Sequence, residues 1–214
     1  MIKHTVVALL ASMAFWSCTK ASGQGSLTLI VSGNVHGQLD PCGWKKNPLG
    51  GLSRKFVKVN EIRQSGIDPI ILDAGDLFFS TKNLTPINKD SELYRAGAVL
   101  EGYNKIGCDA INVGQYELLG GLSFLRTMAQ KTDIPFVSAN LRDSKTLKLV
   151  FEPYRIFSRG ELEIGVIGLT DKVPDTSKSV ISEDYLEIGK KYIDDLREQV
   201  DIVIVLVNSD RKTY

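Results

Sequence analysis

Short apolar runs, each followed by polar residues, alternate along this chain with segments of helical periodicity. In the clearest run, residues 27–31 are apolar or β-branched and lead into 32–37, Ser-Gly-Asn-Val-His-Gly. This pattern predicts a buried strand that ends in a tight polar loop. Further strands are expected at 70–72, 110–113, 136–141, 150–157, 163–169 and 202–207, and helices at 52–64, 92–106, 120–131 and 182–200. The alternation predicts an α/β fold.

Four of the predicted strands end in polar residues: Asn34 and His36, Asp73 and Asp76, Gln115 to Glu117, and Asn208 to Asp210. The carboxyl ends of parallel strands meet at one edge of a sheet, and ligands collect there. The four endings therefore predict a composite active site along one rim.

The first 17 residues have the character of an export signal. Lys3 and His4 give a positive start, and residues 5–16 form an apolar run too short to span a bilayer permanently. Ser17-Cys18 follows, as in bacterial lipoprotein signals. We expect lipidation of Cys18 and attachment to a membrane through it, with ordinary secretion as the alternative.

The predicted domain organisation follows from that signal. Residues 1–17 are the signal peptide, 18–26 form a Gly- and Ser-rich tether, and 27–214 form the folded domain. We therefore expect an exported protein of the cell envelope, either a membrane-anchored lipoprotein or periplasmic.

Composition sets further bounds. With 214 residues and 43% hydrophobic residues, the chain is long enough for one domain with an ordinary core. The net charge is +1 and no basic run contains interleaved aromatics, so nucleic acid is not expected as a partner.

Beyond Cys18, the thiols are Cys42 in a Pro-Cys-Gly loop and Cys108 at the start of an apolar strand. Cys108 is expected to be a buried free thiol, although a disulfide between the two stays open.

Seven short blocks, taken together, resemble the calcineurin-type metallophosphoesterases and, within them, the exported 5′-nucleotidase branch. The blocks are 34–37, 48–54, 72–76, 112–117, 138–140, 164–170 and 204–207. The resemblance implies a sandwich of two β-sheets flanked by helices, an α/β/β/α fold. It also implies hydrolysis of phosphate esters or nucleotides by two divalent cations such as Mn or Zn.

This chain departs from the family's motifs at most ligand positions. In the first block Asn34 replaces an Asp, whereas His36 is kept, and the second block keeps its bridging Asp as Asp76. The third block, Gly-Asn-His-Glu in the family, has Gln115 at the ligand Asn and Tyr116 at the His that serves as proton donor. The next family ligand, a His at a strand end, is matched by a residue without an imidazole, Asn208.

The histidine content leads to the same expectation. Only His4 and His36 are present, and His4 lies in the predicted signal, whereas a two-metal site of this type uses several imidazoles. Tyr116 has a reference pKa near 10, too high for a proton donor at neutral pH. We therefore expect phosphoesterase activity to be weak or lost, with a divalent cation bound at His36 and Asp76 or none.

Several alternatives stay open from the sequence. The protein could be a non-catalytic envelope lipoprotein that uses the fold as a binding or assembly module. His36 could hydrogen-bond its own loop, Asp73 and Asp76 could form a turn, and Glu117 could cap the next helix. The family's last block, Gly-His-x-His, is not in the sequence, so the domain is expected to be incomplete at its C-terminal side. Another chain could then cover the exposed sheet, or the sequence is the first part of a longer reading frame.

Overall fold

A computed structural model describes residues 25–43 and 50–209. In chain order the elements are β1 Leu29–Ser32, α1 Leu52–Gln64, β2 Ile70–Asp73, α2 Lys89–Ile106, β3 Ala110–Asn112, the 3-10 helix η1 Tyr116–Leu118, α3 Leu122–Ala129, β4 Phe136–Val137, β5 Leu141–Asp143, β6 Tyr154–Arg159, β7 Leu162–Thr170, β8 Val180–Ser182, α4 Tyr185–Arg197 and β9 Ile202–Asn208. The predicted Cys18 lipidation site lies outside the described residues.

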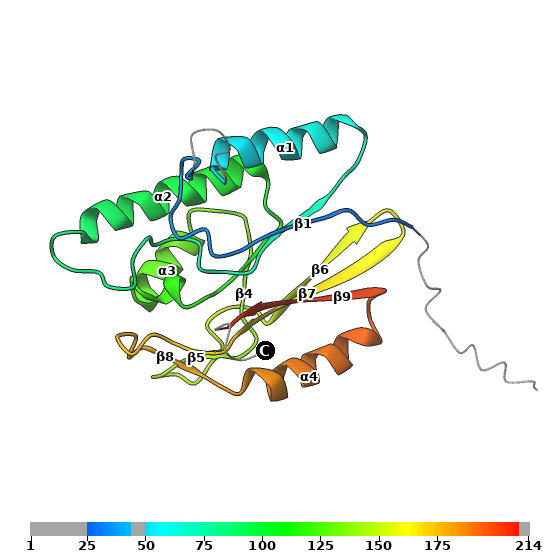
Figure 1. The fold of residues 1–214 in the computed structure, drawn as a ribbon. Coiled ribbons are helices and arrows are strands. Elements are labelled where there is room, and N and C mark those ends of the chain that lie inside the picture. Colours follow the sequence, from blue (N-terminus) through cyan, green and yellow to red (C-terminus); the bar gives the residue numbers. More distant parts are fainter. Residues whose placement is uncertain (1–24, 44–49, 210–214) are drawn as a thin grey trace, which may run out of the picture.

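Two stacked sheets form the middle of the molecule. The first is fully parallel, in the order β1-β2-β3-β4, and the second has the order β6-β7-β9. In the second sheet β6 is antiparallel to β7, whereas β9 is parallel to β7. Helices α1, α2 and α3 lie on the outer side of the first sheet and α4 on the outer side of the second (Figure 1). The predicted α/β/β/α sandwich is therefore confirmed.

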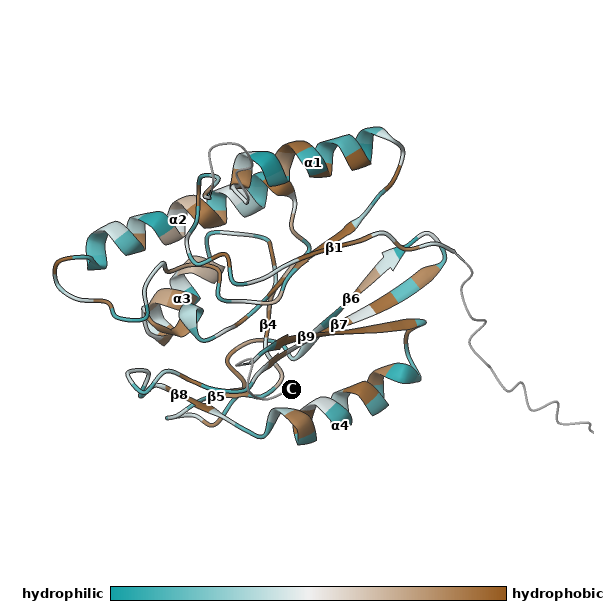
Figure 2. Cartoon of the chain, viewed as in Figure 1, coloured by the Kyte–Doolittle hydropathy of each residue, from teal (hydrophilic) through white to brown (hydrophobic). Residues whose placement is uncertain are grey.

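Alternation of side chains along each strand builds the core between these layers. On β2, Ile71 faces the helices, whereas Ile70 and Leu72 face the second sheet. On β7, Val166 faces the first sheet and Ile167 packs toward α4. Each such side chain is fully buried and contributes on the order of 1.5–3 kcal/mol. Apolar residues accordingly dominate β9 and alternate with polar ones along α1 and α4 (Figure 2).

One predicted strand, 136–141, is wrong as a single element. The chain leaves the first sheet after β4, and β5 pairs instead with β8 in a separate antiparallel ladder. The buried side chain of Asn140 makes the break, because its Nδ2 donates to the carbonyls of Thr170 (2.7 Å) and Glu183 (2.9 Å). The backbone changes partners at the same point, since the N–H of Ala139 donates to the carbonyl of Gly168 (2.7 Å) and the carbonyl of Asn140 accepts from the N–H of Glu183 (2.9 Å).

The helix ends follow local chemistry. Helix α2 stops at Gly107, as predicted, because this residue adopts a left-handed conformation with φ 73°. The guanidinium of Arg63 donates to the carbonyls of Ile106 (2.7 Å) and Gly107 (3.3 Å) at that helix end. Helix α4 begins after Asp184, whose carboxylate accepts from the first free N–H groups of the helix.

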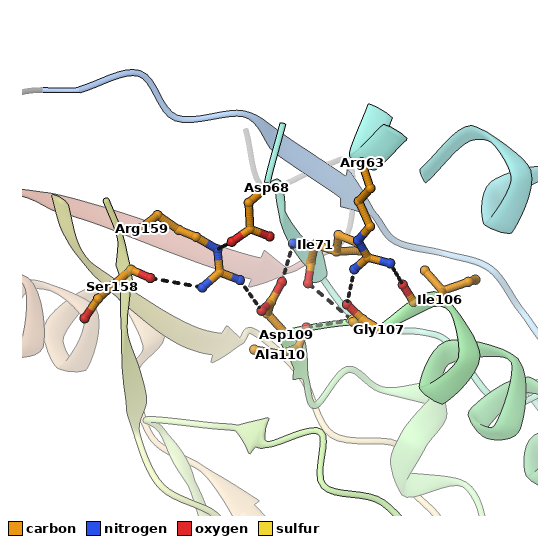
Figure 3. Close-up of polar contacts among 10 residues, drawn as sticks. Arg63, Asp68, Ile71, Ile106, Gly107, Asp109, Ala110, Ser158 and Arg159 are labelled. Carbon is orange, nitrogen blue, oxygen red and sulfur yellow. Dashed lines mark hydrogen bonds and ion pairs between the residues drawn. The ribbon is translucent and has the colours of Figure 1, made fainter. Parts of the chain in front are cut away.

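An ion-pair cluster joins the two sheets at the amino ends of the first sheet's strands (Figure 3). Arg159, at the end of β6, lies 3.1 Å from the carboxylate of Asp68 and donates to Asp109 at 2.7 Å. Asp109 also accepts from the backbone N–H of Ile71 at 2.7 Å. The cluster therefore connects the β6–β7 turn to the residues that precede β2 and β3.

We predict that Arg159→Met lowers the free energy of unfolding by about 1–2 kcal/mol, because it leaves Asp109 without its cation partner. Arg155→Met, on an exposed position of the same strand, is the matched control and should change stability by less than about 0.5 kcal/mol. Urea unfolding monitored by circular dichroism measures both. Equal losses in the two variants would contradict the role assigned to the cluster.

The two cysteines of the described residues differ in environment. Cys42 is exposed and Cys108 is buried, and both are free thiols, so the expected burial of Cys108 is confirmed. Burial raises the pKa of Cys108 to about 12. Since the thiolate is the reactive form, Cys108 should be inert in the folded protein.

We predict that iodoacetamide at pH 8 modifies Cys42 within minutes and leaves Cys108 unmodified until the chain is unfolded. Peptide mass mapping of native and denatured samples checks this. Modification of Cys108 at the same rate as Cys42 in the native protein would contradict the packing described here.

Candidate active site

The loops after β1 and β2 run side by side at the carboxyl edge of the first sheet. The backbone N–H of Asn34 donates to the carbonyl of Gly75 at 2.9 Å, and that of His36 donates to the carbonyl of Asp76 at 2.9 Å. These bonds extend the pairing of the two strands beyond their ends. They place the first two predicted polar clusters next to each other.

Unusual backbone conformations concentrate in these loops. Among the described residues, four other than glycine have positive φ, and three of them are Asn34 (54°), His36 (50°) and Asp76 (57°). Left-handed conformations cost energy in residues with a Cβ, least in Asn, Asp and His. Such outliers accumulate at functional sites, so their position supports a functional interpretation of this edge.

The loop after β3 approaches the loop after β2 closely. Gly75 has φ 101°, and a Cβ on it would lie 2.8 Å from the backbone nitrogen of Gly114. Only glycine permits both the conformation and the contact. The glycine in the sequence Asp73-Ala74-Gly75-Asp76 is therefore required by the close approach of the loop after β3.

Asn208, at the end of β9, brings the second sheet to the same edge. Its Oδ1 accepts from the backbone N–H of Gln115 at 3.2 Å. The backbone N–H of Tyr116 donates to Oδ1 of Asp76 at 2.9 Å. At least one residue from each of the four predicted strand endings therefore converges here, although one ending comes from the other sheet and its Asp210 lies outside the described residues. We call Asn34, His36, Asp76, Gln115, Tyr116 and Asn208 the polar centre.

His36 and Tyr116 pack against each other inside the polar centre. Their ring centroids are 4.3 Å apart with an interplanar angle of 56°. Nδ1 of His36 is buried without a hydrogen-bond partner, so the expectation that this side chain bonds its own loop is not met at Nδ1. Burial, and then the charge of Asp76, raises the pKa of Tyr116 above its usual value. The Tyr116 phenol is therefore a poorer proton donor near neutral pH than a free tyrosine.

The Glu117 carboxylate lies directly beneath the polar centre. It accepts from the backbone N–H groups of Gly114, Asp76, Leu77 and Phe78. The expectation that it caps the next helix is wrong, because α3 begins without a side-chain cap. Burial, and then the charge of Asp76, raises the pKa of Glu117 to about 8, while the backbone N–H donors act in the opposite direction.

Asp73 points away from the polar centre. Its carboxylate accepts from the hydroxyls of Ser32 and Tyr103, each at 2.6 Å, and from the N–H of Gly75 at 2.9 Å. Lys55 donates to Ser32 at 2.7 Å, and burial lowers the pKa of Lys55 while the charge of Asp73 partly offsets this. Of the two aspartates in the motif, Asp73 is therefore structural and Asp76 belongs to the polar centre.

No family model matches the chain. Among curated proteins, it is 29% identical to a 5′-nucleotidase of Vibrio cholerae over 94% of this chain and 38% of that protein. It is 30% identical to the protein UshA of Salmonella pullorum over 87% of this chain and 32% of that protein. The chain thus spans about a third of the length of these relatives.

Solved structures agree with these matches. A 5′-nucleotidase precursor of Thermus thermophilus superposes with a TM-score of 0.72 at 26% identity, over 85% of this chain and 36% of that one. The chain belongs to the 5′-nucleotidase family of calcineurin-like phosphoesterases. The calcineurin-like phosphoesterase YfkN of Bacillus subtilis shares the fold, with a TM-score of 0.65 at 20% identity, over 85% of this chain and 61% of that one.

The polar centre does not fit the two cations implied by the 5′-nucleotidase family. It contains one carboxylate and one imidazole. Its other side chains are two Asn amides, one Gln amide and the phenol of a Tyr. Oδ1 of Asp76 and Oδ1 of Asn208 already accept backbone N–H groups. Across residues 25–43 and 50–209, no three His, Cys, Asp or Glu side chains gather in a way that could hold a metal ion.

Sequence reasoning identified the members of the polar centre but missed what surrounds them. The position of Glu117 beside the ligand motif was visible, but its partners Asp76, Leu77 and Phe78 lie about 40 residues away. The network of Ser32, Lys55, Asp73 and Tyr103 had no sequence signal, because it joins two helices and two strands across the first sheet.

We predict that Asp73→Ala lowers the free energy of unfolding by about 2–4 kcal/mol, because two hydroxyls lose their acceptor and the Lys55 ammonium loses the nearby negative charge that offsets its burial. Tyr103→Phe removes the hydrogen bond to Asp73 and the 3.1 Å contact with the Ser32 hydroxyl, and should cost about 1 kcal/mol. The exposed Asp133 provides the matched control, Asp133→Ala. Urea unfolding measures all three, and a loss in Asp73→Ala no larger than in the control would contradict the structural role.

Proposed function

We propose that this chain is an exported 5′-nucleotidase-like protein that binds at most one divalent cation and hydrolyses phosphate esters or nucleotides weakly or not at all. The observation that carries the proposal is the use of the ligand positions for hydrogen bonds. The Asp76 carboxylate and the Asn208 amide each accept a backbone N–H from the β3 loop. In this arrangement the chain itself occupies acceptor atoms that two cations would need.

His36 and Asp76 are the residues that would hold a single cation. The unpartnered Nδ1 of His36 and the second carboxylate oxygen of Asp76 are suitable donors for Mn²⁺ or Zn²⁺. Such a cation would polarise a phosphoryl oxygen. For proton transfer the chain offers Tyr116, whose pKa is raised by burial, so the leaving group would receive little help.

A non-catalytic binding or assembly module is the second candidate function. It is favoured by the outer edge of the first sheet, where Leu29 is 40% and Val31 is 51% exposed on β1. An uncharged apolar edge strand is suited to pairing with another strand. In this case the polar centre would serve stability and not chemistry.

Export and lipidation remain part of the proposal. They rest on the apolar run 5–16 and on Cys18, which precede the described residues. Within the described residues, no helix has the length and apolar character needed to cross a bilayer. Labelling with radioactive palmitate in a bacterial host, with Cys18→Ala as control, would test the lipid anchor.

We predict at most one equivalent of Mn or Zn per chain by elemental analysis after incubation with each metal. Hydrolysis of p-nitrophenyl phosphate and AMP should be about 10²–10⁴-fold slower in kcat than by the Vibrio cholerae relative, because an effective proton donor is missing. His36→Ala should abolish cation binding. Asn34→Asp, which adds an anionic ligand, should tighten it roughly tenfold or more.

Two equivalents of metal with turnover comparable to the relative would contradict the proposal. No metal and no turnover in the wild type, unchanged in Asn34→Asp, would favour the binding module. Asp133→Ala is again the control, since this residue is exposed and outside the polar centre.

A further inference from the structure

The tips of β2 and β3 are joined by a side chain and not by a ladder. The register of the two strands ends with Leu72 opposite Ala110 and Asp73 opposite Ile111. Beyond that point the Glu117 carboxylate connects the two loops. Its Oε2 accepts from Gly114 at 2.7 Å and from Asp76 at 2.8 Å.

The second oxygen of Glu117 holds the continuation of the β2 loop. Oε1 accepts from the N–H of Leu77 at 2.5 Å and from that of Phe78 at 3.2 Å. Glu117, Leu77 and Phe78 are all 0% exposed. Successive backbone N–H groups that converge on one point form an acceptor-binding concavity, and here the acceptor is the carboxyl group of Glu117 itself.

These bonds determine where Asp76 lies in the polar centre. Its N–H binds Glu117, its carbonyl accepts from His36 at 2.9 Å, and its Oδ1 accepts from Tyr116 at 2.9 Å. The left-handed φ of 57° at Asp76 is sustained by these three contacts together. Removing the Glu117 carboxylate would leave the backbone N–H of Asp76 without its acceptor.

We infer that Glu117 is the positioning residue of the polar centre, holding Asp76 and Tyr116 in place against His36 without the help of a cation. The inference deepens the proposed function and rests on it where cation binding is concerned. Glu117 itself lies beneath the centre and touches neither substrate nor cation. It acts through the backbone of the two loops.

The test compares Glu117→Gln and Glu117→Ala with Asp109→Asn in the full chain. Asp109 is a matched control, because its carboxylate also accepts a backbone N–H across strands but lies before β3, at the opposite end of the sheet. The readout is the Cε1–H resonance of His36 in carbon-edited NMR spectra. His4→Gln assigns it, since the chain has two histidines.

The Tyr116 ring, 4.3 Å from that of His36, should displace the His36 resonance by its ring current. We expect Glu117→Gln and Glu117→Ala to move the resonance toward its position in Tyr116→Leu. Asp109→Asn should lower stability without moving it. Mn²⁺ affinity, followed by paramagnetic broadening of the same signal, should fall about tenfold in Glu117→Gln.

A His36 resonance that stays at its wild-type position in both Glu117 variants would overturn the inference. If the wild type binds no Mn²⁺, the cation site at His36 and Asp76 is excluded, and the resonance still tests Glu117. If the variants do not fold, amide exchange in the wild type decides. Protection of the Leu77 and Phe78 amides comparable to that of β2 supports the inference, and exchange as fast as in exposed loops overturns it.

Discussion

The convergence of four backbone N–H groups on the buried carboxylate of Glu117 is the interaction on which the polar centre depends. Strands β2 and β3 are short, with 4 and 3 residues, and their ladder ends before the loops that carry Asp76 and Tyr116. A buried carboxyl group is costly unless its oxygens are hydrogen-bonded, and here the loops supply the donors. The carboxylate and the loops therefore stabilise each other.

The packing of the two sheets brings a residue of the second sheet into the polar centre. Because β9 is parallel to β7 and packs under the first sheet, its last residue, Asn208, arrives at the same edge as the tips of β1, β2 and β3. Gly168 permits the close approach of β7 to β4, because a Cβ at this position would clash with the carbonyl oxygen of Val137. At the other end of the sheets, Arg159 connects the layers. The polar centre is thus a product of layer packing and not of one strand alone.

Much of this could be predicted from the sequence. Apolar runs with polar endings identified β1, β2, β3 and β9, and the family resemblance identified the α/β/β/α layers. The break at Asn140 was missed, because its partners Thr170 and Glu183 lie 30 and 43 residues away. Likewise, local propensity cannot tell that Asp73 turns toward Tyr103 while Asp76 turns toward Tyr116, because both choices depend on long-range packing.

We propose that hydrogen bonds within the chain, and not a pair of cations, hold the strand tips of this 5′-nucleotidase family member together. Anomalous diffraction from crystals grown with Mn²⁺ tests it most directly. We predict no more than one anomalous peak, located between His36 and Asp76, with the Glu117 hydrogen bonds intact. Two peaks about 3.5–4 Å apart within the polar centre would contradict it.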